Sequence, residues 1–229
     1  MRVALSGPVV LSGPVRVLAL DAAGAGCFVA LVVDGKMRAE RRAPGGRGQA
    51  ALLPTMARDV LAEAGAFDLV AVTVGPGSFT GLRGAIALAH GLALGAGCPV
   101  VGVTVAEALA EALPKLPGRE IWVALDNHRG RVFLDVAGVL AAWPLDGLPR
   151  PDGPVALAGD QASEVATRLA AQGHDVTLTD SRHPRASHVA AVGLRRASGG
   201  LPALAAQPLY VEPPEARLPA GGLRPVPAG

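Results

Sequence analysis

The sequence contains few aromatic residues and only two cysteines. Aromatic side chains make up 3% of the 229 residues, although hydrophobic residues as a whole make up 50%. Alanine, valine, leucine and glycine must therefore fill the core, since these are the residues available for burial. Cys27 and Cys98 lie far apart and form no CxxC motif. This spacing argues against a disulfide framework and suits a reduced, cytoplasmic protein.

The sequence also lacks a strong charge bias, a metal-binding histidine pattern and an uninterrupted membrane span. Its formal net charge is +2, which disfavours a free-standing RNA-binding module. Residues 84–106 carry no charge, but Gly95, Gly97 and Pro99 interrupt this run, so we expect no transmembrane helix. The histidines form no HxxxH or HExxH pair, and we therefore expect no metal site.

The chain is organised around the stretch TVGPGSFTGLR. A short apolar strand, residues 69–74, leads into a Gly-Pro-Gly turn. Ser78 follows the turn and is a good N-cap, because its hydroxyl can accept a hydrogen bond from an amide of the next turn. The pattern then predicts a helix over residues 79–94, ended by Gly95 or Gly97.

Two interpretations of this glycine loop remain open. A loop that feeds a helix N-terminus is suited to anion binding, because unpaired amides and the helix dipole point the same way. Gly75, Gly77 and Ser78 would then contact a phosphate or carboxylate. The alternative is a tight turn with no ligand, and Ser78 has no Gly-x-Ser-x-Gly frame that would make it a nucleophile.

The helix after the loop is rich in small residues at four-residue spacing. Gly81, Ala85 and Ala89 form one such row, and Gly84 and Leu88 begin another that Leu92 continues. Each glycine lowers helix propensity by up to about 1 kcal/mol relative to alanine. Because glycine is unfavourable in a helix, its repeated use suggests that another backbone approaches this helix closely. That backbone could lie inside the domain or across an interface with a partner.

Hydrophobic periodicity predicts an α/β fold with mixed sheets and flanking helices. In the first half we expect strands at residues 15–21, 27–33, 36–42, 69–74 and 99–103, and helices at residues 49–64, 79–94 and 105–113. In the second half we expect strands at residues 121–126, 131–136, 155–158 and 176–179, and helices at residues 161–171 and 187–197.

The same signals divide the chain into two related subdomains. Residues 15–113 form the N-terminal subdomain and residues 119–212 the C-terminal one, separated by the Pro- and Gly-containing segment 114–118. Each begins with an apolar strand that ends in an acid and is followed by a turn and a second strand. Residues 1–14, which duplicate the sequence LSGPV, are expected to be a disordered extension, and residues 213–229 a mobile tail.

The two strand-ending acids are Asp21 and Asp126. Facing each other across a cleft, they could hold Mg²⁺ and position phosphates, but a phosphotransferase would also need groups that cradle the phosphate. No hydroxyl follows Asp21, where the sequence reads Ala22-Ala23-Gly24. We therefore expect a vestigial nucleotide or anion site, made of Asp21, Gly75, Gly77, Ser78 and Asp126, with no catalytic residue.

The GPGSFTGLR motif (residues 75–83) resembles the TsaB family. Agreement extends to LALD at residues 18–21, GLALG at residues 91–95, ALD at residues 124–126 and PLY at residues 208–210. The likeness covers about residues 15–212 and is strongest over the first half.

This resemblance implies an actin-like, ribonuclease H-like fold of two related subdomains. It implies a non-catalytic scaffold required for threonylcarbamoyladenosine formation at position 37 of tRNAs. The scaffold would bind and activate the catalytic subunit TsaD together with the ATPase TsaE, would meet tRNA through that complex, and would form a homodimer when TsaD is absent. It would need no cofactor of its own, although ATP or ADP could bind at the complex interface.

In the family, the partner surface is formed by two helices of the N-terminal subdomain, here residues 49–64 and 79–94. The interface residues that this implies are Leu53, Met56, Val60, Gly81, Gly84, Ala85, Leu88, Gly91 and Leu92. Ala22 replaces the family's usual hydroxyl, and Arg47-Gly48-Gln49 stands where a histidine is common; both changes weaken a nucleotide site. The rival hypothesis is an ATP-dependent phosphotransferase or a metallopeptidase-like enzyme of the same fold.

Overall fold

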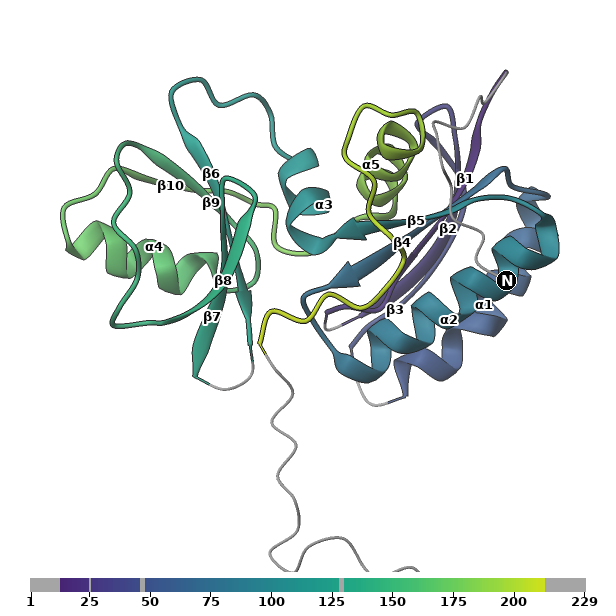
Figure 1. Cartoon of the computed structure of the whole chain (residues 1–229), viewed down its shortest axis with the longest axis horizontal. Helices are drawn as coiled ribbons and strands as arrows, with labels where there is room; N and C mark the ends of the chain where they lie inside the picture. The colour runs from purple at the N-terminus through teal and green to yellow at the C-terminus, as the bar shows by residue number, and fades with distance from the viewer. Residues whose placement is uncertain (1–12, 25, 46–47, 128–129, 213–229) are drawn as a thin grey trace, which may run out of the picture.

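The protein is an α/β structure whose two halves are each built on a five-stranded mixed sheet (Figure 1). The computed structural model describes residues 13–24, 26–45, 48–127 and 130–212. The predicted extension, apart from its last two residues, and the predicted tail lie outside these ranges. In the described residues, the topology is that of the actin-like fold predicted from the resemblance.

The first half contains strands, in the sheet order β3-β2-β1-β4-β5, and helices that cover them. β1 and β2 are antiparallel, whereas β1, β4 and β5 are parallel neighbours. The elements are β1 (Arg16–Asp21), β2 (Cys27–Val33), β3 (Lys36–Ala43), α1 (Gln49–Ala64), β4 (Leu69–Gly75), α2 (Phe79–Ala96), β5 (Val100–Thr104) and α3 (Val105–Glu111).

The buried strands of this sheet have two apolar faces because alternate side chains point to opposite sides. In β4, Val70 and Val72 pack in the cluster that includes α1 and α2, whereas Leu69 and Ala71 pack on the opposite face. Figure 1 shows α1 and α2 side by side across one face of the sheet, with the last helix on the other.

The ends of α2 confirm the sequence-based prediction. The Ser78 hydroxyl accepts a hydrogen bond from the Gly81 amide at 3.3 Å, and Gly97 adopts a left-handed conformation that ends the helix. Thr104 caps α3 through a capping box with Glu107, in which each side chain accepts from the other residue's amide.

The second half repeats the topology of the first, with the sheet order β8-β7-β6-β9-β10. Pairing is antiparallel for β6–β7 and β7–β8 and parallel for β6–β9 and β9–β10, as in the first sheet. The prediction of two related subdomains is therefore confirmed. The elements are β6 (Glu120–Asp126), β7 (Arg131–Val136), β8 (Val139–Pro144), β9 (Val155–Ala158), α4 (Ala162–Ala171), β10 (Val176–Leu178) and α5 (Ala186–Ala197).

The chain returns to the first half after β10, which the division at residues 114–118 did not predict. Helix α5 buries Val189 and Val192 against the face of the first sheet opposite α2. The segment that follows, residues 199–212, is called the C-terminal strap here. Its Leu204 carbonyl accepts from the Gly102 amide at 2.9 Å, and its Leu209 amide donates to Val74 O at 2.8 Å.

Arg196 holds this returning segment in place. Its buried guanidinium donates from Nη1 to Gly102 O at 2.7 Å and from Nε to Pro202 O at 2.8 Å, and Nη2 forms an ion pair with Glu107. One side chain therefore joins α5 to β5, α3 and the C-terminal strap. A buried charge is tolerated here because hydrogen-bond acceptors surround it.

Replacing Arg196 tests this arrangement. Arg196→Met should lower the free energy of unfolding by about 3 kcal/mol, because it leaves Glu107 and two carbonyl groups without their donor. Arg195→Met is the matched control, since Arg195 forms an exposed ion pair with Glu111 at 2.8 Å and should contribute less than about 1 kcal/mol. Urea unfolding measures both, and equal losses would contradict the assignment of Arg196 as the anchor.

Candidate functional site

The GPGSFTGLR motif closes onto the turn that follows β1. The Ser78 amide donates to Ala23 O at 2.7 Å. A Cβ placed on Gly77 would lie 2.2 Å from Ala23 O, and one placed on Gly81 would lie 2.1 Å from Ala22 O. Real Cβ atoms do not approach that closely, so only glycine fits at either position.

This packing favours the tight-turn interpretation of the glycine loop. Two amides at the start of α2 are already used within the chain, because Ser78 donates to Ala23 and Gly81 donates to the Ser78 hydroxyl. Ser78, one of the residues that we expected to contact a phosphate, instead holds a carbonyl of its own chain. The tight-turn interpretation accounts for these contacts, and the anion site stays a prediction.

Asp21 lies at the end of β1 and is buried. Its Oδ1 accepts from the Thr73 hydroxyl at 2.5 Å and from the Ala23 amide at 3.1 Å. Burial raises the pKa of this carboxyl, an effect that the hydrogen bonds from Thr73 and Ala23 and the charges of Arg42 and His183 only partly oppose. An enclosed carboxyl of this kind holds two strands and a turn together.

The partner of Asp21 was not identified from the sequence, although a signal was present. β1 and β4 are parallel, and Leu20 pairs with Val72. Thr73 therefore stands beside Asp21 at the same edge of the sheet. It is the one hydroxyl in the apolar strand LVAVTVG, and such a residue usually has a polar neighbour on the next strand.

Asp126 occupies the corresponding position in the second half, at the end of β6. Its amide donates to Asp160 Oδ1 at 2.9 Å, so the loop after β9 closes over it. Within the residues that the structure describes, no group of three or more His, Cys, Asp or Glu side chains is placed to hold a metal ion.

The nine predicted interface residues are not equally accessible. Four of them are buried in the core of this chain, so no partner can reach them directly; they are Leu53, Val60, Gly81 and Ala85. Gly84 explains the close packing of the two helices, since a Cβ there would lie 2.7 Å from the Cβ of Ala50. The remaining four, Met56, Leu88, Gly91 and Leu92, are partly or fully exposed.

The exposed side of α2 is apolar between Gly84 and Ala96 except for His90, whereas that of α1 carries Leu52 together with the charged residues Arg58 and Glu63. Leu94 on α2 is 77% exposed and Leu52 on α1 is 47% exposed, and Gly91 has open space around it. From Gly84 to Ala96 helix α2 contains no acidic or basic residue apart from His90. We call this surface the α1–α2 face. None of the helices that the structure describes has the length and apolar character that crossing a membrane requires.

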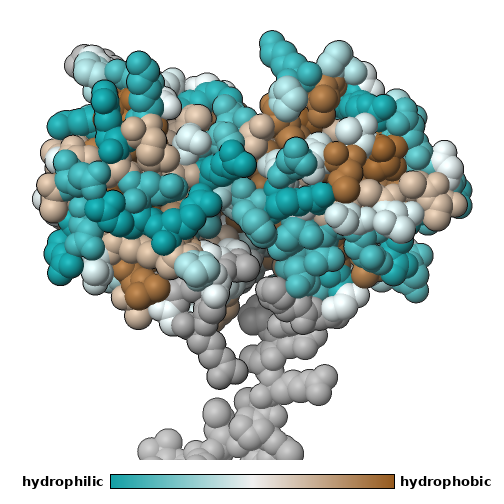
Figure 2. Space-filling model, turned by 180° about the vertical axis from the view of Figure 1, so that it is seen from behind, coloured by the Kyte–Doolittle hydropathy of each residue, from teal (hydrophilic) through white to brown (hydrophobic). Residues whose placement is uncertain are grey.

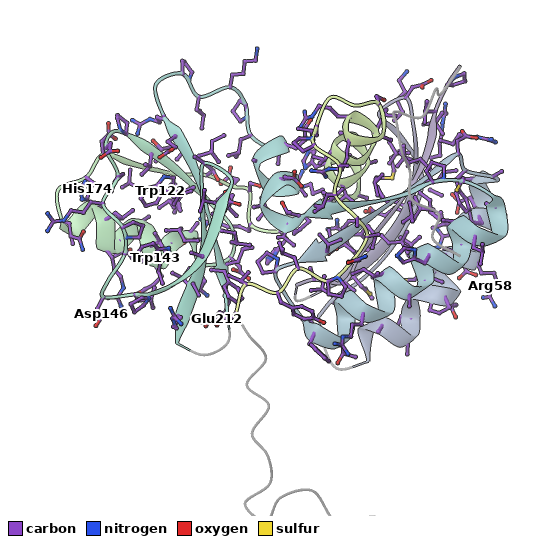
Figure 3. All side chains as sticks on the ribbon, viewed as in Figure 1. Arg58, Trp122, Trp143, Asp146, His174 and Glu212 are labelled. Carbon is purple, nitrogen blue, oxygen red and sulfur yellow. The ribbon has the colours of Figure 1, made fainter. Side chains whose placement is uncertain are left out.

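Apolar side chains are also exposed on the second half. Val139 on β8 is 71% exposed, and Leu178 on β10 is exposed as well. In Figure 2 hydrophobic residues gather on the rear of the second half, while the rear of the first half is mostly hydrophilic. A hollow at the outer end of the second half, away from the motif, is lined by Asp146, Leu148, Arg150, Gln172 and His174 (Figure 3).

Two glycine substitutions in α2 test the packing of the motif. Gly81→Ala should destabilise the protein by about 3 kcal/mol, because the new methyl group meets Ala22 O and the backbone must move. Gly91→Ala is the control: a methyl group there has open space around it, so the variant should stabilise the protein by about 1 kcal/mol through helix propensity. Thermal and urea unfolding report both values, and a neutral Gly81→Ala variant would show that the turn does not pack as described.

Comparison with known proteins shows which proteins this chain resembles. The model of the TsaD family, tRNA N6-adenosine threonylcarbamoyltransferase, matches residues 46–134. The chain is 37% identical over 123 residues to the tRNA threonylcarbamoyladenosine biosynthesis protein TsaB of Escherichia coli, covering 52% of this chain and 53% of that protein. It is 34% identical over 121 residues to TsaB of Haemophilus influenzae, covering 51% of each chain. The chain thus spans about half the length of the curated relatives that it matches.

Solved structures extend the similarity beyond that half. YeaZ from Pseudomonas aeruginosa is 28% identical, with a TM-score of 0.68 over 86% of this chain and 99% of that chain. A second structure, described as an uncharacterized protein from Pseudomonas aeruginosa with similarity to peptidase YeaZ, has a TM-score of 0.70 over 86% of this chain and 100% of that chain. The topology and the sequence similarity both support the TsaB/YeaZ family for this chain.

Proposed function

We propose that this protein is the TsaB subunit of threonylcarbamoyladenosine biosynthesis on tRNA. It acts as a non-catalytic scaffold that binds and activates a TsaD subunit. Two relatives with this pathway in their names, at 34% and 37% identity, support the assignment. The TsaE ATPase and the tRNA complete the proposed assembly and meet this subunit within it.

The observation that carries the proposal is the α1–α2 face. Leu94 is more exposed than any other large hydrophobic side chain in the described residues. It projects from a helix whose outer side has no acid and no lysine, and Gly91 beside it leaves the helix backbone accessible. Exposed large apolar side chains of this kind tend to mark protein interaction sites.

A TsaD-type partner suits this face because of shared architecture. The TsaD family model matches residues 46–134, a range that contains both α1 and α2. Two proteins with the same helix pair can pack these pairs against each other, as two copies do around a two-fold axis. The same geometry allows a second copy of this chain to occupy the face when TsaD is absent.

The proposed scaffold role is supported by what the motif does in this subunit. Its glycines bring α2 against the turn after β1, and Asp21 is enclosed by Thr73 and Ala23. These residues build the helix pair and do not form an open site for a reacting phosphate. A nucleotide in the assembly would then bind where this subunit meets its partner.

A charge placed on the α1–α2 face tests the proposal. Leu94→Arg should weaken binding to TsaD by roughly a hundredfold or more, because an apolar contact at the centre of an interface is replaced by a charge that must be desolvated. Val139→Arg is the matched control: it adds the same charge at a site of similar exposure on the second half. Co-purification followed by calorimetry gives both affinities.

The outcomes separate the candidate surfaces. Loss of binding in Leu94→Arg alone supports the α1–α2 face, and loss in Val139→Arg alone would move the interface to the second half. Unchanged binding and unchanged tRNA modification in Leu94→Arg would refute the proposal. The mass of the free chain with and without Leu94→Arg reports whether two copies pair through the same face.

A further inference from the structure

Three side chains form an exposed cluster at the start of α2. The Arg83 guanidinium carbon lies 3.8 Å from the centre of the Phe79 ring, and Arg83 donates from Nε and Nη2 to the Tyr210 hydroxyl at 3.2 and 2.8 Å. The Phe79 and Tyr210 ring centres are 6.4 Å apart. Phe79 is 57% exposed and Tyr210 52% exposed. We call these residues the arginine–aromatic cluster.

The cluster is assembled by the fold from distant parts of the chain. Phe79 and Arg83 come from α2, and Tyr210 comes from the C-terminal strap. The strap is fixed just before Tyr210, because the Leu209 amide donates to Val74 O at 2.8 Å. His90 Nε2 donates to Ala206 O, also at 2.8 Å, and ties the strap to α2. Tyr210 is therefore held over α2 by main-chain contacts.

The charge of Arg83 is not matched by an acid in the part of the chain that the structure describes. Its acceptor there is the Tyr210 hydroxyl, which is neutral. Arg131 of β7, by contrast, pairs at 2.5 Å with Glu212, which lies two residues beyond Tyr210 on the same strap. Helix α2 contains no other arginine, no lysine and no acidic residue. The cluster therefore presents one guanidinium cation, of which only Nε and Nη2 donate hydrogen bonds to Tyr210.

This chemistry fits a protein partner better than a nucleic acid. Single-stranded RNA is bound by stacking rings together with a row of cations that follows the phosphates. Here Arg131 is paired to an acid and the whole chain has a formal net charge of only +2. Tyrosine and arginine are, on the other hand, the residues enriched among the strongest contributors to protein interfaces. Phe79 and Arg83 also lie on the same helix as Leu94, so the cluster adjoins the α1–α2 face at the start of α2.

We propose that the arginine–aromatic cluster is the polar anchor of this docking face and binds a carboxylate side chain of the partner. The Tyr210 hydroxyl accepts from Nε and Nη2 of the guanidinium, and the Phe79 ring packs against its planar face. The remaining N–H groups of Arg83 donate to the partner's carboxylate. This inference rests on the proposed function, because it assigns the chemistry of one part of the same interface.

The test measures the affinity of the full chain for its TsaD at low and at moderate salt. Arg83→Gln should weaken binding about tenfold at low salt and should flatten the salt dependence, because a charge-assisted contact is lost. Tyr210→Phe keeps the ring but removes the acceptor, and it should weaken binding less. In the double variant the two effects should not add, since both act on one contact. Arg150→Gln, which removes an exposed arginine from the second half, is the control for net charge.

Each outcome decides a separate point. If the wild-type chain binds TsaD, and Arg83→Gln binds with the same affinity and salt dependence, the cluster is not the anchor, although the α1–α2 face still stands. If the wild-type chain does not bind TsaD, both proposals fail. If the isolated chain binds a single-stranded RNA oligonucleotide and Arg83→Gln abolishes that binding, the cluster belongs to nucleic acid and the inference is overturned.

Discussion

The close approach of α2 to the turn after β1 is the constraint on which the rest of the structure depends. Gly77 and Gly81 allow the carbonyl groups of Ala23 and Ala22 to reach the first turn of the helix, where any larger residue would collide. The contact costs helix propensity and uses amides that could have held an anion. In return it fixes the direction of α2 across the sheet. The position of its outer side, including Leu94, follows from that direction.

Two further contacts fix the C-terminal part of the chain against both halves of the protein. Arg196 joins α5 to β5, α3 and the C-terminal strap, and the strap then runs along β4 and α2. The strap ends in an ion pair between Glu212 and Arg131 of β7, so it reaches the second half. The helix pair that we propose as the docking face is therefore supported from behind by a segment that lies far away in the sequence.

Local signals in the sequence predicted most of the fold, because each acts over a few residues. The Ser78 cap and Gly97 define the two ends of α2 through contacts within one turn of chain. β8 was not predicted, since its residues are only partly buried and lack a strong alternation. The pairing of Thr73 with Asp21, the anchoring by Arg196 and the position of Tyr210 depend on contacts across 52, 94 and 127 positions. No periodicity reports such contacts. The small-residue row was predicted, but its inner glycines serve packing within this chain and only its outer residues are available to a partner.

The central claim is that α2 uses its first turn for its own chain and its outer side for TsaD. Hydrogen–deuterium exchange of the full chain, with and without saturating TsaD, tests this claim most directly. Peptides covering residues 49–64 and 79–96 should gain protection when TsaD is added. Protection confined to peptides from the second half, with α1 and α2 unchanged, would contradict it.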